Sequence, residues 1–314
     1  MIVPPSKKSF SPPLRLGTRG STLARWQAKW TAEQLQAHGI ATEIVVIQTG
    51  GDLVQNESIV NMGAQGVFTK EIQYALLDNK IDIAVHSLKD LPTENVDGLC
   101  LAAVPKRASY RDAFVSLVAE RIEDLPAHSR IGTGSMRRKT QVLYHFGDRY
   151  RVEDIRGNVE TRLRKLAQGE YDALLLAEAG LHRLGLADSI RSLLEPPFFL
   201  PAIGQGALGW EIRTENQHIA ELFQPLNDFH SFAAVRAERA MLRELQGGCS
   251  APIAALGMVE DSTLTLRGRI LSLDGKSMFD ATLSAPLSEE AELLGINVAK
   301  KLNSLTAVSA CLSQ

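Results

Sequence analysis

The sequence has 314 residues, of which 45% are hydrophobic and 22% charged, a balance typical of a globular protein with two or three domains. Its formal net charge of −2 provides no overall basic field for nucleic acid or an anionic membrane, so an anion site must be built locally. No stretch approaches the roughly 18 apolar residues of a membrane span, and residues 1–13 lack the apolar run of a signal peptide and are expected to be disordered.

The cysteines favour a reducing compartment. There are three, at positions 100, 249 and 311, an odd number without the spacing of zinc ligands. This pattern predicts a cytoplasmic protein without a metal site. Cys100 is expected to be a small core residue, as unpaired cysteines often are.

From residue 14 the chain alternates strand-like and helix-like runs, the pattern of an α/β fold with a largely parallel sheet. In the first helix, Leu23, Trp26 and Trp30 recur at helical spacing. The nearly continuous apolar run at 81–87 predicts a buried parallel strand. The first stretch is expected to contain strands at 14–19, 41–49, 81–87 and 99–105 and helices at 22–39 and 69–79.

The second stretch repeats this alternation after a polar interruption at 105–112. It is expected to contain strands at 112–117, 129–134, 151–155 and 172–177 and helices at 135–146, 159–170 and 179–186. A Pro-rich and Gly-rich connector then enters a late apolar strand, which we expect to return to the first sheet. From Asp228 the pattern changes to one helix, three strands and a final helix, typical of a small α+β domain with an antiparallel sheet. The predicted domains are 14–105 with 206–224, then 106–200, then 228–314.

Arginines gather near the carboxyl ends of the predicted strands, where open α/β sheets bind their ligands. A single arginine after a strand is more often a solvated loop residue. Six at equivalent places favour a ligand with several negative charges, because guanidinium binds carboxylate or phosphate through two hydrogen bonds. The Gly-rich turns at 132–135 and 203–209 do not decide for phosphate, so a polycarboxylate is at least as good a candidate. The six are Arg19, Arg137, Arg138, Arg156, Arg162 and Arg183.

The segment HSLKDLPT, residues 86–93, follows the buried strand at the same edge and carries Ser87, Lys89 and Asp90. A carboxylate in an arginine-lined cleft is kept ionised by its neighbours and can stabilise a developing cation or take a proton. The alternative is a turn in which Asp90 is merely ion-paired, and position alone does not choose between the two.

Cys249 follows a helix and two glycines that predict a left-handed C-terminal stop. A helix C-terminus carries negative partial charge, which disfavours a thiolate, and no histidine base lies nearby in the sequence. The thiol is therefore interpreted as an anchor point and not as a nucleophile that turns over.

Taken together, the motifs RLGTRGSTLARWQA, DIAVHSLKDLPT, IGTGSMRR, RGNVETRLRKL, LPAIGQGALG and ERAMLRELQGGCSAPI resemble those of the porphobilinogen deaminase family, in the family's order. The resemblance covers about residues 14–290. It implies a transferase of tetrapyrrole (heme) biosynthesis that joins four porphobilinogen molecules head to tail with loss of ammonia and releases hydroxymethylbilane by hydrolysis. It also implies a monomer with two lobes like those of periplasmic binding proteins, the active site between them, and a third domain that presents the cysteine.

The resemblance further implies a dipyrromethane cofactor, attached to Cys249 through a thioether. Asp90 would be the catalytic carboxylate, stabilising the cationic azafulvene left when ammonia departs. The residues that would hold the carboxylates of the cofactor are Ser87, Lys89, Thr133, Ser135, Arg137, Arg138 and Arg162. Those that would bind substrate or the lengthening chain are Arg19, Ser21, Arg156 and Arg183.

The sequence departs from the family pattern at a few positions. Asn61 and Gln65 stand where relatives often have lysines, and Gly134 stands where serine is common, so weaker binding of carboxylates is expected. The alternative hypothesis is a non-catalytic cytoplasmic module that binds polycarboxylates on a fold like that of the binding proteins.

Overall fold

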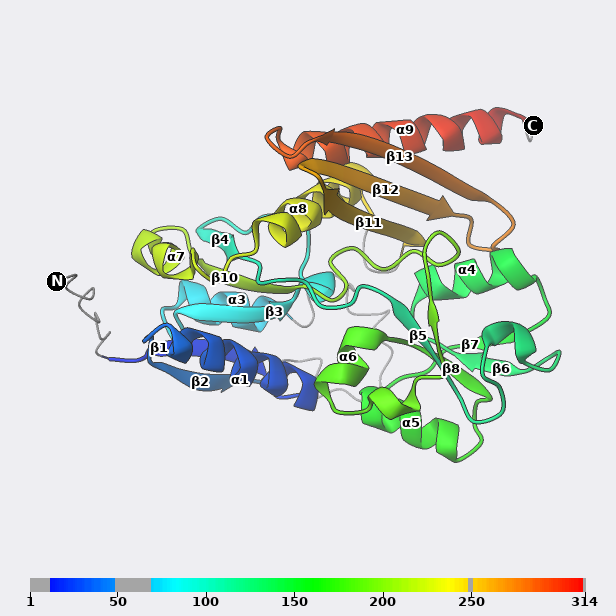
Figure 1. Ribbon diagram of the computed structural model, residues 1–314, viewed down its shortest axis with the longest axis horizontal. Coiled ribbons are helices and arrows are strands. Elements are labelled where there is room, and N and C mark those ends of the chain that lie inside the picture. The colour runs from blue at the N-terminus through cyan, green and yellow to red at the C-terminus, as the bar shows by residue number, and fades with distance from the viewer. Residues whose placement is uncertain (1–11, 49–68, 248–250, 313–314) are drawn as a thin grey trace.

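The computed structural model describes residues 12–48, 69–247 and 251–312 and contains three sheets (Figure 1). Two lobes, each with a five-stranded sheet, lie side by side, and a third unit with a three-stranded sheet runs along the top of both in this view. Each sheet lies within one of the three predicted domain ranges, although the boundaries themselves stay a prediction. Disorder was predicted for residues 1–13, and residues 1–11 of this segment lie outside the described part.

The first lobe is a sheet with helices on both faces. Its strands, in spatial order, are β2 (Thr42–Ile47), β1 (Leu14–Arg19), β3 (Ile83–Ser87), β10 (Leu208–Arg213) and β4 (Leu99–Ala103). Helices α1 (Thr22–Ala37) and α7 (Gln217–Phe223) pack on one face, and α3 (Lys70–Leu77) packs on the other. Strands β1, β2 and β3 are parallel, whereas β10 is antiparallel to both of its neighbours. The late strand therefore returns to the first sheet.

The second lobe has the same design. Its strands, in spatial order, are β7 (Arg151–Glu153), β6 (Arg130–Gly132), β8 (Ala173–Ala177), β5 (Asp112–Ser116) and β9 (Ser192–Leu194). Helix α4 (Met136–Phe146) packs on one face, and α5 (Val159–Ala167) and α6 (Glu178–Arg183) pack on the other. Strand β5 is antiparallel to β8 and β9, as β10 is to its neighbours in the first sheet. Strand β9 and helix α7 were not predicted from the sequence.

The chain crosses between the lobes twice, at residues 104–111 and 195–207. The two crossing segments are hydrogen-bonded to each other. The amide of Gln205 donates to the carbonyls of Tyr110 and Arg111 over 2.7 and 3.2 Å, and Arg107 Nε donates to the Gln205 carbonyl over 2.8 Å. These contacts fix the strand ends of both lobes at one shared edge.

The third unit follows the predicted order of elements. Helix α8 (Phe229–Glu244) precedes the antiparallel strands β11 (Ile253–Glu260), β12 (Thr263–Leu271) and β13 (Met278–Pro286), and α9 (Ala291–Leu312) follows them. Both helices pack on the sheet around one apolar core. On the side of the second lobe, the buried Arg269 donates to the Pro197 and Phe198 carbonyls over 2.9 and 3.0 Å.

Two local features differ from simple sequence patterns. The buried side chains of α1 include Ala28, Thr31 and Leu35, whereas Trp26 on the apolar stripe is 37% exposed. After α8 the backbone is left-handed at Gln246, with φ of 51°, and not at Gly247, whereas Gly248, the second glycine of the predicted stop, lies outside the described residues. A Cβ at Gly247 would lie 2.5 Å from Ile253 Cδ1 and 2.7 Å from Leu242 Cδ1, so a larger residue there would displace the ends of these two side chains.

Candidate active site at the edge shared by the two lobes

Asp90 lies where β3 ends. A single 3₁₀ turn, η2 (Leu88–Asp90), follows the strand, and the buried Leu88 anchors this turn in a small core with Val104 and Val235. Asp90 is exposed at the end of the turn. The shape of the turn therefore presents the carboxylate to solvent while its neighbour holds the backbone in place.

Three further predicted residues line the same hollow as Asp90. Ser87 ends β3, Arg19 ends the adjacent parallel strand β1, and Ser21 caps α1 by accepting the backbone N–H of Ala24 over 3.3 Å. Parallel neighbours end at the same edge of a sheet, which is why residues about 70 positions apart meet here. His86 also lines the hollow, and its Nε2 lies 2.9 Å from Glu211 Oε2 in a buried pair.

The second lobe contributes the N-terminus of α4. Ser135 is the capping residue and its hydroxyl accepts the Arg138 N–H over 3.4 Å, while the buried Thr133 hydroxyl accepts the Ser135 N–H over 3.2 Å. The first turn of a helix carries positive partial charge and favours anions. These two predicted residues therefore lie in a setting suited to a carboxylate.

Arg137 and Arg138 are buried and share one carboxylate, that of Asp112. Arg137 Nη1 lies 2.7 Å from Asp112 Oδ2, and Arg138 Nη2 lies 2.8 Å from Oδ1. Burial alone would raise the pKa of Asp112, but the two guanidiniums outweigh it and hold that pKa well below its ordinary value. Two cations facing one anion leave an excess positive charge, and Arg137 Nε is buried without a hydrogen-bond partner among the residues that the structure describes.

Two more predicted cations contribute to this region. Burial, together with the guanidiniums of Arg138 and Arg137, lowers the pKa of Lys89 to about 8, although Asp90 and Asp112 oppose the shift. Burial and Arg138 likewise lower the pKa of Arg162 to about 10. A pKa lowered in this way signals an ammonium or guanidinium short of anionic partners.

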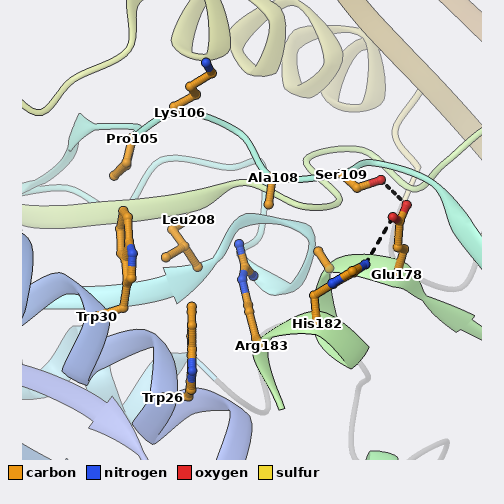
Figure 2. Close-up of a pocket in the computed structure, with 11 residues that line it drawn as sticks. Trp26, Trp30, Pro105, Lys106, Ala108, Ser109, Glu178, His182, Arg183 and Leu208 are labelled. Atoms are coloured by element: carbon orange, nitrogen blue, oxygen red, sulfur yellow. Dashed lines mark hydrogen bonds and ion pairs between the residues drawn. The ribbon is translucent and has the colours of Figure 1, made fainter. Parts of the chain in front are cut away.

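The remaining two arginines lie elsewhere. Arg156 is exposed in the turn after β7. Arg183 Nη2 donates to the Gly206 carbonyl over 2.7 Å, and its guanidinium lies 5.9 Å from the ring centre of Trp26, in a second cavity of about 400 Å³ (Figure 2). The cavity that Arg183 lines does not contain Asp90.

The residues present fit a group with several carboxylates, such as a dipyrromethane. The excess charge around Asp112, the unpartnered Arg137 Nε and the low pKa of Lys89 all favour an added anion. Cys249, the predicted attachment point, lies outside the described residues, as do Asn61 and Gln65. In the described ranges no group of three or more His, Cys, Asp or Glu side chains is arranged to hold a metal ion.

Two functional groups were missed from the sequence. Asp112 follows an arginine at the start of a strand, in the motif RDAF. An acidic residue at the start of an apolar strand was the signal that could have identified it as a partner for the arginines. Gln205 was treated as part of a nonspecific glycine-rich turn, yet its amide donates to Asp112 Oδ1 over 2.9 Å. Together they orient the paired arginines.

Comparison with known proteins places this geometry in a family. The family model described as "Porphobilinogen deaminase, dipyromethane cofactor binding domain" matches residues 14–221, and the model of the C-terminal domain of porphobilinogen deaminase matches residues 232–304. A relative named porphobilinogen deaminase from Syntrophotalea carbinolica is 45% identical over 92% of each chain. One of the same name from Geobacter metallireducens is 47% identical over 92% of this chain and 91% of its own.

Solved structures are similar at a coarser level. The immunogenic lipoprotein A from Vibrio vulnificus has 12% identity and a TM-score of 0.44, covering 72% of this chain and 99% of its own. The methionine-binding protein MetQ has 11% identity and a TM-score of 0.44, covering 72% of this chain and 92% of its own. Because both family models match and relatives at 45% and 47% identity span 92% of its length, the chain belongs to the porphobilinogen deaminase family.

Proposed function

We propose that this enzyme joins four porphobilinogen molecules head to tail, loses one ammonia with each addition and releases hydroxymethylbilane by hydrolysis, as a step of tetrapyrrole biosynthesis. Family membership supports the activity. The observation that carries it is the exposed Asp90 carboxylate beside a region with excess positive charge, where Arg137 and Arg138 share Asp112. This reaction needs two parts. One is a carboxylate that stabilises the reacting cation, and the other is a set of arginines that bind the carboxylates of the substrate.

Asp90 is the proposed catalytic group. When the aminomethyl group of porphobilinogen loses ammonia, the pyrrole ring becomes a cation, and a nearby carboxylate lowers the energy of that charge. The same carboxylate can accept the proton of a pyrrole N–H or return it, because it is exposed at the end of a turn that Leu88 anchors.

The dipyrromethane cofactor of the family, when bound, supplies the pyrrole carbon to which the first substrate is joined. In this proposal the carboxylates of the cofactor are bound by the second lobe and by the segment 86–93 of the first lobe. The residues involved are Ser87, Lys89, Thr133, Ser135, Arg137, Arg138 and Arg162. Arg19, Ser21, Arg156 and Arg183 bind substrate or the growing chain. The position of Arg19 and Ser21 beside Asp90 supports this division.

Helix α8 supports the assignment of the attachment point to Cys249. The chain leaves this helix only a few residues before the cysteine. On the same helix, Arg239 donates to the carbonyls of Leu91 and Pro92 over 2.9 and 2.6 Å, directly after Asp90. One helix therefore precedes the proposed attachment point in the chain and also holds the loop that carries the proposed catalytic carboxylate.

The function is tested on protein made in a cell that supplies porphobilinogen. We expect an intact mass above that of the polypeptide by one dipyrromethane, together with conversion of added porphobilinogen to hydroxymethylbilane. Cys249→Ser should give the bare polypeptide mass and no turnover. Cys100→Ser is the matched control. Cys100 lies on β4, and its thiol is partly buried beside Thr214. This variant should keep both the mass of the cofactor-bearing protein and its activity. A bare mass with no turnover in the unaltered protein would refute the proposal.

The rest of the functional picture is also proposed. We propose a monomer that works in the cytoplasm without a nucleic-acid partner, and the net charge of −2 is compatible with that. Light scattering during gel filtration tests the first point. In the described residues, no helix combines the length and the apolar character needed to cross a membrane. The alternative of a non-catalytic binding module is not favoured, because the relatives carry the name of an enzyme.

A further inference from the structure

A second cavity lies beside the hollow of Asp90, along the neighbouring face of helix α1. Leu23, Ala24 and Gln27 of α1 face the hollow of Asp90, whereas Trp26 and Trp30 of the same helix line a cavity of about 400 Å³. Figure 2 shows the two indoles rising from α1, with Arg183 on α6 of the other lobe and the side chain of Leu208 between them. Both lobes therefore build the walls, together with the first crossing segment.

The walls suit a flat apolar ring. Trp26 is 37% exposed although tryptophan usually buries most of its surface, and Trp30 is half-buried beside it. A cavity of this size falls at the lower end of the range for small-molecule sites, so it accommodates a molecule with one ring and not a linear tetrapyrrole. Indole faces bind such rings by offset or edge-on stacking.

The charge in the cavity calls for an anion. The guanidinium of Arg183 contacts a backbone carbonyl and the Trp26 ring, and in the described part of the chain no carboxylate pairs with it. Burial lowers its pKa to about 10, as expected for a cation without a counter-ion. The acidic residue in the wall, Glu178, is already occupied, since Ser109 and Arg111 both donate to it. Lys106 also lines the cavity, but its ammonium points away from it, so Arg183 is the cation available to a bound anion (Figure 2).

We propose that this cavity binds a small aromatic carboxylate with a single ring, its carboxylate on Arg183 and its ring against Trp26 and Trp30. Porphobilinogen, one pyrrole ring with two carboxylates, belongs to this class, and its choice as the physiological ligand rests on the proposed function. Asp90 is not among the residues that line this cavity, so a molecule held here does not react. The cavity is a holding site for substrate, separate from the catalytic hollow.

The test titrates the cofactor-bearing protein with pyrrole-2-carboxylate and follows tryptophan fluorescence. The sequence has three tryptophans, and the third, Trp210, is fully buried against Phe223, so a saturable change reports Trp26 and Trp30. Trp30→Leu should weaken binding about tenfold, because it removes a stacking face, whereas Trp30→Phe should retain most of it. Pyrrole without a carboxylate should not produce a saturable change.

Lys106→Ala is the matched control, since Lys106 also lines the cavity but its ammonium points away from it (Figure 2). Should Trp30→Leu fail to fold, Ala108→Leu fills the cavity from the crossing segment and should block the probe. The proposal is overturned if the unaltered protein shows no saturable change, or if neither Trp30→Leu nor Ala108→Leu affects it. Loss of binding in Arg19→Leu alone would also overturn it by placing the probe beside Asp90. Turnover of porphobilinogen in the same preparations reports separately on the proposed function.

Discussion

Arg107 Nη1 lies 2.6 Å from Glu238 Oε1, and this ion pair joins the first crossing segment to helix α8. The carboxylate of Glu238 is wholly buried and also accepts the backbone N–H groups of Gly204 over 2.7 Å and Gly257 over 2.8 Å. One side chain thus contacts both segments that connect the lobes and the first strand of the third unit. This buried charge therefore contributes to the relative placement of the three units, together with the hydrogen bonds of Gln205, Arg239 and Arg269.

Removing that charge should be costly. In Glu238→Gln the Arg107 guanidinium stays buried without its anion, so we expect the free energy of unfolding to fall by about 3–5 kcal/mol. Urea unfolding followed by circular dichroism measures the change. Glu292→Gln is the control, because its pair with Arg236 is about half exposed and should be worth no more than about 1 kcal/mol. Equal losses in the two variants would show that the buried pair does not hold the units together.

Much of the fold could be predicted from the sequence because it depends on local pattern. The nearly continuous apolar run at 81–87 does contain a central strand, Ile83–Ser87, which is buried up to its last residue, and the changed pattern after Asp228 does mark an antiparallel sheet. Trp26 and Trp30 show the limit of such patterns. Their spacing places them on one side of a helix, but it carries no information that this side faces a cavity shared with the other lobe. That outcome is set by tertiary packing.

The candidate site was predictable only in part, for a similar reason. The arginines could be placed at strand ends, and Arg19 does lie beside Asp90. The sequence did not indicate that Arg137 and Arg138 both bind Asp112, which lies 25 positions before Arg137. Which cation meets which anion depends on the order of strands in the sheet, and β5 enters that order as an antiparallel strand between β8 and β9.

Lys89 predicts a specific dependence on pH. Its pKa is about 8 in the folded protein, whereas the ordinary value of 10.5 applies to the unfolded chain. Between pH 8 and 10.5 the unfolded chain therefore binds a proton that the folded protein does not. Stability therefore rises with pH across this window, and the protonated ammonium costs stability below it. In protein without cofactor, Cys249→Ser, the further change Lys89→Met should raise the free energy of unfolding at pH 7 by about 1 kcal/mol or more.

This gain should shrink as pH rises through 8 towards 10, and urea unfolding at each pH measures it. Lys29→Met on α1, where the lysine is exposed, is the control and should show no such trend. A gain that is constant from pH 7 to 10 would contradict a lowered pKa at Lys89. In protein that bears the cofactor the gain should be smaller, since bound carboxylates favour the charged form.

Asp90→Asn should separate binding from turnover. The amide has the shape of the carboxylate but neither its charge nor its ability to take a proton, so we expect kcat to fall about 100-fold or more while KM changes little. Steady-state kinetics with porphobilinogen measure both constants. Asp97→Asn, an exposed carboxylate farther along the same loop, should leave them unchanged. A kcat for Asp90→Asn within twofold of the unaltered enzyme would remove Asp90 from its catalytic role.

Arg239 should act on the reaction through the loop that carries Asp90. Its two donors hold the carbonyls of Leu91 and Pro92, so Arg239→Leu frees the backbone directly after Asp90, the proposed catalytic group. A carboxylate misplaced by an ångström loses much of its effect on the transition state, whereas the arginines proposed to bind substrate are untouched. We therefore expect kcat to fall about tenfold with KM within about twofold, and Arg239→Lys to recover part of the loss.

The matched control for Arg239 is Arg243→Leu, one turn farther along α8, where the guanidinium is 40% exposed and lies 3.8 Å from Glu292. It should leave kcat and KM unchanged. A positioning role and a merely structural role differ in one respect: a structural defect lowers the unfolding midpoint and the amount of active enzyme but leaves the kcat of the folded fraction intact. Active-site titration through the cofactor mass gives that fraction. An unchanged kcat per active site in Arg239→Leu would show that α8 does not align Asp90, and that the Leu88 anchor is sufficient on its own.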